Sequence, residues 1–289
     1  MRPPAAVVAG AANVDIKVRS SLPPGGGVST PGRIRLCPGG VARNAAEALA
    51  RMGAEVRLLS AVGQDAWGDW VIAATAAGGV DCTGVLRRPG QTGLYVMVNG
   101  AGIADTAIIE SVDPRSWPGS AEGPAPLLVL DANLLEPVLA ALAAPAERIA
   151  LIGTSPAKVA RLRELLPRTW LICLTAAEAA VLVGVAAPPG GEPLARAVQA
   201  LGPAHVLLTE GPRGLGLLVE KWMAHPARTP DAFVDATGAG DVAAAAVIYG
   251  LAAGSAPERV LAAGAEAAAM TIATWGNVPP EVGTVWSGT

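Results

Sequence analysis

The sequence predicts an α/β fold in which helices cover both faces of a mostly parallel sheet. Short, continuously apolar segments recur along the chain, and Ala-rich or amphipathic segments of helical length separate them. Strands of a parallel sheet are apolar throughout because both of their faces are buried, and strand–helix alternation is typical of such sheets. No repeat, low-complexity linker or break in composition divides the 289 residues, so we expect one domain over residues 1–289.

The first part of the chain is expected to contain buried strands, helices and more exposed strands. The run Ala5-Ala6-Val7-Val8-Ala9-Gly10 predicts the first buried strand. The helix expected over 41–52 has an apolar face and ends before Gly53, since glycine commonly terminates helices. Alternation within 33–36 indicates an exposed strand away from the main core. The other elements here are a strand over 56–62, a helix over 69–77 and an exposed strand over 93–98.

The rest of the chain continues this alternation. Apolar strands are expected over 127–130, 149–152, 170–174, 206–208 and 216–219, with helices over 156–166 and 193–201. Two long Ala-rich helices, over 241–252 and 257–271, follow them.

Composition excludes several classes of protein. Hydrophobic residues make up 52% of the chain and charged residues 16%, which rules out a disordered chain. The net charge of −3, without a long basic run, argues against nucleic-acid binding. The longest uncharged stretches fall short of the ~20 apolar residues that span a bilayer, so no membrane association is expected. Cys37, Cys82 and Cys173 lie far apart, which argues against disulfides or a zinc site and favours a cytoplasmic location.

Two glycine clusters precede predicted helices, where backbone N–H groups can approach a ligand. Residues 38–44 read Pro-Gly-Gly-Val-Ala-Arg-Asn, and residues 235–241 read Asp-Ala-Thr-Gly-Ala-Gly-Asp. The amides of Ala239, Gly240 and Asp241 are expected to form an anion site at the start of the second helix. The Asp241 carboxylate could accept a hydroxyl proton there, or it could be an ordinary helix cap. The helix N-terminus is expected to lower the pKa of Asp241.

The clusters resemble the two signatures of the ribokinase (PfkB) family of carbohydrate and nucleoside kinases. Gly39-Gly40 with Asn44 matches the first signature, and 235–241 matches the second. The resemblance extends to 10–15, which is similar to the family's first strand and sugar-binding turn, and to 207–214, which is similar to its TxGxxG nucleotide segment. It implies a three-layer α/β/α ribokinase-like fold with a small β-sheet lid from about 18–36 and 91–112. It also implies a homodimer through this lid.

Several segments are similar to the pseudouridine kinases of this family, namely 12–16, 29–32, 38–47, 131–133 and 154–158. This similarity implies a small-molecule nucleoside substrate and ATP-dependent phosphorylation of the 5′-hydroxyl of pseudouridine. Mg²⁺ is expected as well, because the charge of the triphosphate must be neutralised during transfer.

The resemblance implies roles for individual residues. Asp241 would be the general base, with Gly238, Ala239 and Gly240 as the anion hole. The ribose would bind Asn13, Asp15, Gly39, Gly40 and Asn44, and the nucleotide would bind Thr209, Gly211 and Gly214. Asp235 and Thr237 resemble the place where family members bind a potassium ion, with turn capping as the alternative.

Three features depart from the family or have no assigned role. The family shows Asn-x-x-Glu after a central strand, whereas this chain has Thr175-Ala176-Ala177-Glu178. Glu178 would therefore act on Mg²⁺ indirectly, without the asparagine. The second lid segment contains no residue that can be assigned to the nucleobase. Arg43 could face a phosphate, the base or solvent.

Three alternatives remain open from the sequence. A sibling kinase for ribose, adenosine or another nucleoside would share every catalytic residue. A non-catalytic binding protein derived from the family is a second alternative, because Thr175 replaces the asparagine. A nicotinamide-binding protein is the third, although Gly10-Ala11-Ala12-Asn13 does not match GxGxxG and neither cluster matches the P-loop pattern.

Overall fold

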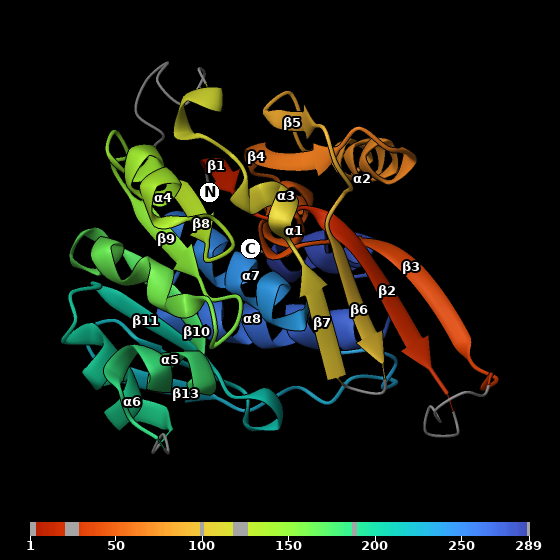
Figure 1. Ribbon diagram of the computed structural model, residues 1–289. Helices are drawn as coiled ribbons and strands as arrows, with labels where there is room; N and C mark the ends of the chain where they lie inside the picture. The colour runs from red at the N-terminus through yellow and green to blue at the C-terminus, as the bar shows by residue number, and fades with distance from the viewer. Residues whose placement is uncertain (1–3, 21–28, 99–100, 118–126, 187–189, 288–289) are drawn as a thin grey trace.

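The large sheet has nine strands in the order β13-β12-β11-β10-β9-β8-β1-β4-β5 (Figure 1). A computed structural model describes residues 4–20, 29–98, 101–117, 127–186 and 190–287. The strands from β11 to β5 pair in parallel, and β12 and β13 extend the sheet antiparallel at one edge. The strands are β1 (Ala5–Ala9), β4 (Glu55–Gly63), β5 (Val85–Arg88), β8 (Leu128–Asp131), β9 (Ile149–Ile152), β10 (Leu171–Thr175), β11 (His205–Thr209), β12 (Leu215–Leu218) and β13 (Trp222–His225).

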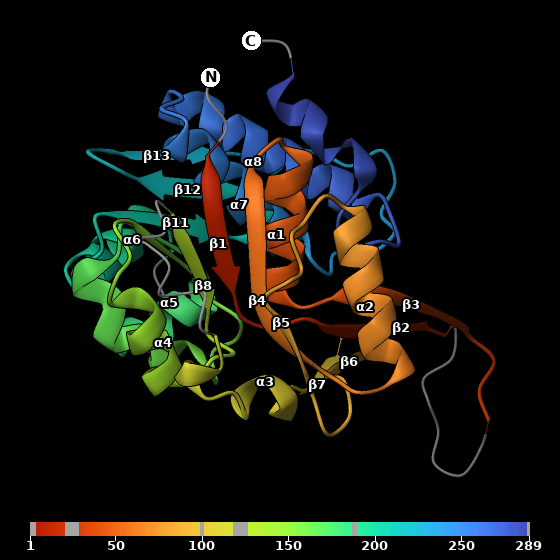
Figure 2. The same cartoon turned by 90° about the horizontal axis from the view of Figure 1, so that it is seen from above.

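Helices cover both faces of this sheet, so the fold has three layers (Figure 2). One buried apolar cluster joins the sheet to α1, α2, α7, α8 and η5, and a second joins its other face to α3, α4, η3, α5 and α6. The helices are α1 (Val41–Arg51), α2 (Ala66–Ala77), α3 (Ala107–Glu110), α4 (Glu136–Ala143), α5 (Ala176–Val183), α6 (Gly191–Gln199), α7 (Ala239–Ala252) and α8 (Pro257–Ile272), with 3₁₀ segments η1 (Pro114–Ser116), η3 (Val159–Arg168), η4 (Gly211–Arg213) and η5 (Pro280–Trp286).

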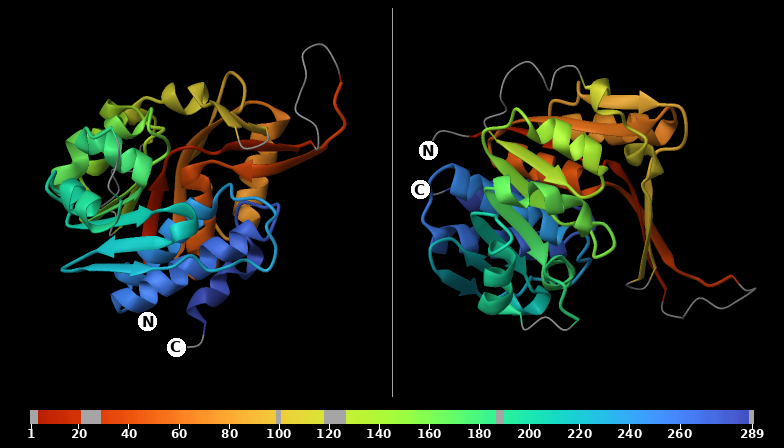
Figure 3. Two further views of the ribbon diagram at one scale, coloured as in Figure 1. Left: turned by 90° about the horizontal axis from the view of Figure 1, so that it is seen from below. Right: turned by 60° about the vertical axis from the view of Figure 1, so that its left-hand side comes forward.

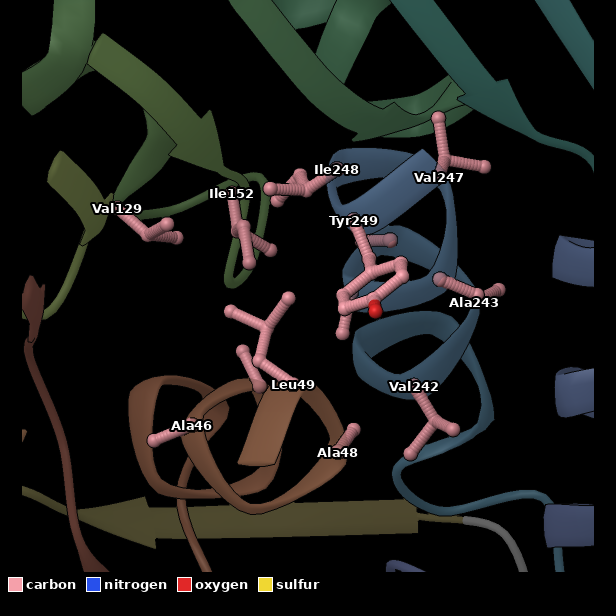
Figure 4. Packing of buried hydrophobic residues seen from close by; sticks show 14 of the residues in the cluster. Ala46, Ala48, Leu49, Val129, Ile152, Val242, Ala243, Val247, Ile248 and Tyr249 are labelled. Atoms are coloured by element: carbon pink, nitrogen blue, oxygen red, sulfur yellow. The ribbon is translucent and has the colours of Figure 1, made fainter. Parts of the chain in front are cut away.

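Packing between α1 and α7 fixes the relative position of the two glycine-led helices. Leu49 of α1 points toward Tyr249 of α7 and Ile152 of the sheet in this core (Figure 4). Much of α7 is alanine, and its small side chains let neighbouring helices approach closely while remaining fully buried. The starts of α1 and α7 therefore lie near each other although they are far apart in the sequence.

A second, four-stranded sheet projects from the body (Figure 3, right). Its order is β3-β2-β6-β7, with β2 (Asn13–Arg19), β3 (Arg33–Gly39), β6 (Leu94–Val98) and β7 (Ala101–Asp105). Residues 21–28 and 99–100 of the expected lid segments lie outside the described residues. The strand β2 begins at Asn13, so Asn13 and Asp15 lie on the small sheet and not in a turn after β1 as the sequence suggested.

The predicted α/β fold class is confirmed, but one segment predicted as an α-helix is a 3₁₀ helix. The segment expected as an α-helix over 156–166 is the 3₁₀ segment η3. Pro167 near its end has no N–H and cannot close an α-helical turn there. Among the described residues, no helix is both long and apolar enough to cross a membrane.

Candidate active site

A cleft of about 1220 Å³ lies where the small sheet meets the carboxyl ends of the large sheet's parallel strands. In open parallel sheets, ligands bind at this edge of the strands. The small sheet contributes one wall, and the strand ends with the start of α7 contribute the rest. Of the predicted site residues, those that line the cleft are Asn13, Asp15, Gly40, Asn44, Asp235, Thr237, Gly238 and Asp241.

Asp241 joins the two glycine clusters. It lies in the first turn of α7, and its Oδ2 accepts a hydrogen bond of 2.9 Å from Nδ2 of Asn44 on α1, 197 residues away in the sequence. The Asn44 side chain is buried, and its Oδ1 accepts from the Arg43 guanidinium. An amide nitrogen has two hydrogens, so the second N–H of Asn44 is free to meet a ligand in the cleft.

The expected lowering of the Asp241 pKa is wrong. The pKa of Asp241 is raised to about 7, mainly by burial and to a lesser extent by the nearby charges of Asp131, Asp15 and Glu178, against the lowering effect of the Asn44 hydrogen bond. Desolvation of a carboxylate surrounded by protein therefore outweighs the favourable field of the helix N-terminus. A pKa near neutrality suits a general base better than the depressed value that the sequence suggested.

Asp15 is held by two amides from opposite ends of the chain. Its Oδ1 accepts from Nδ2 of Asn13, and its Oδ2 accepts from Nδ2 of Asn277, both at 2.6 Å. Burial raises the pKa of Asp15 to about 6, against the lowering effects of the Asn277 hydrogen bond and the Lys17 charge. Gly39 lies directly against this carboxylate, and a Cβ there would come within 2.1 Å of Oδ1. Gly39 therefore makes room for Asp15.

The turn before α7 has the shape expected of an anion site, with one correction. Gly238 is the N-cap with φ of 86°, a conformation that side chains disfavour, and a Cβ there would meet the Asn277 carbonyl at 2.9 Å. The Ala239 amide donates to the Ala236 carbonyl at 3.2 Å, so it is not a free donor. The amides of Gly240 and Asp241 are first-turn donors without an acceptor in their own helix.

Open space lies in front of Gly240. A Cβ built on this residue would meet no atom within 4 Å. The packing of the fold therefore does not require a glycine here, and Gly240 leaves open space beside the first-turn amides of α7.

Asp235 is paired with a lysine that the sequence reasoning missed. Nζ of Lys17 on β2 lies 2.7 Å from Oδ1 of Asp235 and donates to the Trp275 carbonyl at 3.0 Å. The same Oδ1 accepts from the Thr237 amide at 2.9 Å, which is the turn capping considered above. Burial raises the pKa of Asp235, but its hydrogen bonds with Lys17 and Thr237 and the Lys17 charge lower it overall.

The predicted nucleotide residues lie beside the cleft and not in its lining. Thr209 ends β11, Gly211 is the first residue of the short η4 turn that follows, and Gly214 comes directly after that turn. Thr175 does line the cleft, and it pairs in register with Thr209 on the neighbouring strand. Thr209 therefore lies next to a residue of the cleft lining.

Glu178 has a structural role at the start of α5. Its Oε2 accepts from the Thr175 amide at 2.7 Å, and Oγ1 of Thr175 accepts from the Glu178 amide at 3.3 Å, which forms a capping box. Burial raises the pKa of Glu178, against these hydrogen bonds. Among the described residues, no group of three or more His, Cys, Asp or Glu side chains could hold a metal ion by itself.

Arg43 does not face solvent, and it is not among the residues that line the cleft. It is buried, forms an ion pair with Glu47 in the next turn of α1, and donates to Oγ1 of Thr75 at 3.2 Å on α2. Its Nη1 also donates to the Pro38 carbonyl. Arg43 therefore supports the start of α1, and with it Asn44.

Sequence reasoning assigned no role to a further set of polar residues. Asp131 at the end of β8 is buried and accepts from the amides of Ala11 and Ala42, so its carboxylate ties β1 to the start of α1. Asn133 and Lys158 line the cleft and bond to each other at 3.0 Å. Both lie in segments, 131–133 and 154–158, that are similar to the pseudouridine kinases. That similarity was the only feature of the sequence that pointed to these two residues.

A model of the pfkB family of carbohydrate kinases matches residues 4–281. The chain is a member of the pfkB family. The family resemblance seen in the glycine clusters is therefore confirmed, and the cleft that these clusters form is the candidate active site of a pfkB-family protein.

Curated relatives of this pfkB-family chain are sugar and nucleoside kinases. It is 35% identical over 121 residues to the uncharacterized sugar kinase YeiI of Escherichia coli K12 (39% of this chain, 33% of that protein). It is 33% identical over 146 residues to the pseudouridine kinase of the same organism (46% of each chain). It is 26% identical over 268 residues to the cytidine kinase of Thermococcus kodakarensis (85% of this chain, 91% of that protein). The first two matches span half or less of those relatives.

Solved structures confirm the ribokinase-like fold. The ribokinase of Thermotoga maritima superposes with a TM-score of 0.82 at 21% identity, covering 99% of this chain and 100% of that chain. The Arabidopsis thaliana ribokinase, complexed with ribose and ATP, superposes with a TM-score of 0.78 at 23% identity and full coverage of both chains. At these identities the similarity concerns the fold alone.

Proposed function

We propose that this pfkB-family chain transfers the terminal phosphoryl group of ATP to the 5′-hydroxyl of pseudouridine. The observation that carries the proposal is the hydrogen bond between Asn44 and Asp241, which brings both family signatures into one cleft with Asp15. A carboxylate of near-neutral pKa beside the free amides of a helix start suits the transfer of a phosphoryl group to an alcohol.

Asp15, Asn13 and Asn44 orient the acceptor. Vicinal ribose hydroxyls can both donate and accept hydrogen bonds, so a carboxylate with flanking amides can pair with both. Asn277 and Asn13 hold the two oxygens of Asp15 in place before the substrate arrives. A ligand without these hydroxyls would leave buried polar groups unpaired, which favours ribosyl acceptors.

Asp241 takes the proton of the attacking hydroxyl. Asn44 fixes the orientation of its carboxylate, and the raised pKa makes proton uptake favourable near pH 7. The amides of Gly240 and Asp241 face the phosphoryl group as it moves, and stabilise charge on its oxygens. Positioning and charge stabilisation account for most of the catalysis in such transfers.

ATP extends from this turn past Thr175 toward Thr209 and the η4 turn with Gly211 and Gly214. When bound with the triphosphate, Mg²⁺ would supply the positive charge that phosphoryl transfer requires. Mg²⁺ typically uses one or two carboxylates together with substrate phosphates. Glu178, occupied in its capping box, would act on the ion through water.

The small sheet acts as a lid that excludes water, so that the nucleoside hydroxyl and not water accepts the phosphoryl group. Ile34 and Ile103 are large apolar residues of this sheet that are 62% and 77% exposed. These exposures support a homodimer formed through the lid. Cys37, Cys82 and Cys173 are free thiols, in keeping with the cytoplasmic location we propose.

The choice of pseudouridine rests on the similar segments named above and on the pseudouridine kinase among the relatives. The cytidine kinase relative, which matches over a greater length, favours a second candidate, another nucleoside as the acceptor. Both candidate functions use the same ribose contacts and the same general base, Asp241, so the two acceptors differ only in the nucleobase.

A coupled assay of ADP release tests the proposal. Purified protein with Mg²⁺ and ATP is tested on pseudouridine, uridine, cytidine, adenosine, ribose and fructose 6-phosphate, with Asp241→Asn as the inactive control. We expect the highest kcat/KM for pseudouridine. A preference for another nucleoside would support kinase activity but refute pseudouridine as the substrate. Nucleoside binding without turnover would refute kinase activity.

A further inference from the structure

Lys17 is the largest charged side chain that the fold buries completely beside the proposed active site. It is 1% exposed, and it lies on β2 in the same alternating series as Asn13 and Asp15, so the three side chains share the face of the strand toward the cleft. A lysine is almost never this buried unless its charge is paired. The groups that pair with the Lys17 ammonium therefore indicate the role of this residue.

The Lys17 ammonium joins two separate loops. One is the turn before α7, through Oδ1 of Asp235 at 2.7 Å, and the other is the segment after α8, through the carbonyl of Trp275 at 3.0 Å. These loops also touch directly, since Gly238 packs against Asn277. Arg19, two residues along β2, places its guanidinium 4.9 Å from the centre of the Trp275 ring, so the strand contacts the same segment twice.

This geometry does not fit the potassium ion that the family resemblance suggested at Asp235 and Thr237. Oδ1 of Asp235 already accepts from the Lys17 ammonium and from the Thr237 amide, so the ammonium lies against the carboxylate that would ligate the ion. A second positive charge at this carboxylate would be repelled by the ammonium at close range and with little water between them. The positive charge at this position is supplied by the chain itself.

We propose that the Lys17 ammonium replaces the monovalent cation, so that the enzyme needs no potassium to hold the turn before α7 in its active shape. An ammonium and a potassium ion carry the same charge and are both held by carboxylate and carbonyl oxygens. This inference rests on the proposed kinase function for its activity measurements. Lys17 is a positioning residue, because it acts on the Gly240 and Asp241 amides through Asp235 and the turn that follows it.

The position of Lys17 on β2 links the small sheet to the turn before α7. The strand that carries Asp15, the acceptor-binding carboxylate, also carries the cation that supports the catalytic turn. Any movement of β2 away from the body would separate Lys17 from Asp235. The turn before α7 therefore keeps its ion pair with Lys17 only while β2 is packed against the body.

The wild-type protein provides the first test. Initial rates are measured in choline, sodium and potassium chloride at equal ionic strength, and the thermal unfolding midpoint is measured in the same salts. We expect rates within about twofold of one another and no rise in the midpoint specific to potassium. A rate increase of tenfold or more in potassium, or a potassium-specific rise in the midpoint, would overturn the proposal.

Lys17→Met provides the second test, because it keeps an unbranched side chain that is only one atom shorter and removes its charge. In choline chloride we expect its kcat to fall about tenfold or more and to recover when potassium is added, with a smaller change in KM. Potassium should also raise its midpoint by about 3 °C or more. Lys17→Gln serves as a milder second variant if Lys17→Met does not fold, and the exposed Lys221→Met is the matched control.

A folded Lys17 variant that keeps wild-type kcat in choline would overturn the proposal, as would a folded variant that potassium neither stabilises nor reactivates. The midpoint measurements need no substrate. If the protein phosphorylated no acceptor at all, they would still decide the role of Lys17, so this proposal and the proposed function fail separately.

Discussion

Replacing Asn44 with leucine tests the link between the two family signatures. Leucine has a similar size and shape but no N–H, so Asn44→Leu removes the 2.9 Å hydrogen bond to Asp241. It also removes the acceptor of one Arg43 hydrogen bond, but Arg43 keeps its contacts with Glu47, Thr75 and Pro38. The hydrogen bond from Asn44 lowers the Asp241 pKa, which is about 7 with the bond present. Its loss must therefore raise the pKa.

The size of the shift follows from the charge on the acceptor. A hydrogen bond to a charged group contributes about 1.5–3 kcal/mol, and one pKa unit corresponds to about 1.4 kcal/mol. The Asp241 pKa should therefore rise by about one to two units. At pH 7 the ionised fraction of the base falls from about one half to between about 1 and 10%. The rate at pH 7, relative to the high-pH plateau of the same variant, falls about 5- to 50-fold.

The assay is kcat/KM for the nucleoside at saturating Mg²⁺ and ATP, measured between pH 5.5 and 9.5. Any loss of ribose binding in Asn44→Leu lowers the plateau at every pH, whereas loss of the Asp241 contact moves the inflection. Gln199→Leu, which removes an amide from α6 far from the cleft, is the matched control. An unchanged inflection in Asn44→Leu, with only a lower plateau, would refute the view that Asn44 tunes the base.

Three further substitutions test the site. Asp241→Asn should lower kcat about 10²- to 10⁴-fold while the nucleoside still binds in calorimetry; a wild-type rate would contradict the role of the base. Asp241→Asn should also have a higher unfolding midpoint than the wild type at pH 8, and the difference should grow from pH 5 upward. The reason is that the raised pKa of Asp241 makes the wild type lose stability as the pH rises through about 7. Asp15→Ala should raise the KM for the nucleoside about tenfold or more with little change in kcat, and an unchanged KM would exclude the ribose contact. Gly240→Ala should fold at least as stably, since a Cβ there has open space, yet lose about tenfold or more in kcat/KM because its methyl group covers the anion site; full activity would show that no phosphoryl group lies there.

The sequence predicted most of the large sheet because its strands are buried on both faces. Runs such as Ile149–Ile152 are entirely apolar, and a parallel strand covered by helices has no other pattern. The strand β7 lies within the expected lid segment 91–112, but its own residues did not identify it as a strand, since all five are exposed and its Gly and Ala residues carry no strand signal. The strands β5 and β13 are short and only partly buried, so neither alternation nor a continuous apolar run identified them.

The candidate site was predicted where its residues lie in local motifs, and was missed where contacts join distant segments. Asn277 bonds to Asp15 across 262 residues, and Lys17 bonds to Trp275 across 258. No spacing or periodicity in one sequence encodes such contacts. The Asp241 pKa shows the same limit, because the helix start is visible in the sequence whereas the burial that decides the pKa arises from packing.

A crystal structure with ADP, aluminium fluoride and pseudouridine would test the central claim most directly. The account predicts that the fluoride group contacts the amides of Gly240 and Asp241. It also predicts that the 5′-oxygen of the nucleoside lies within hydrogen-bond distance of the Asp241 carboxylate. A fluoride group bound away from the start of α7, with Asp241 remote from the acceptor oxygen, would contradict it.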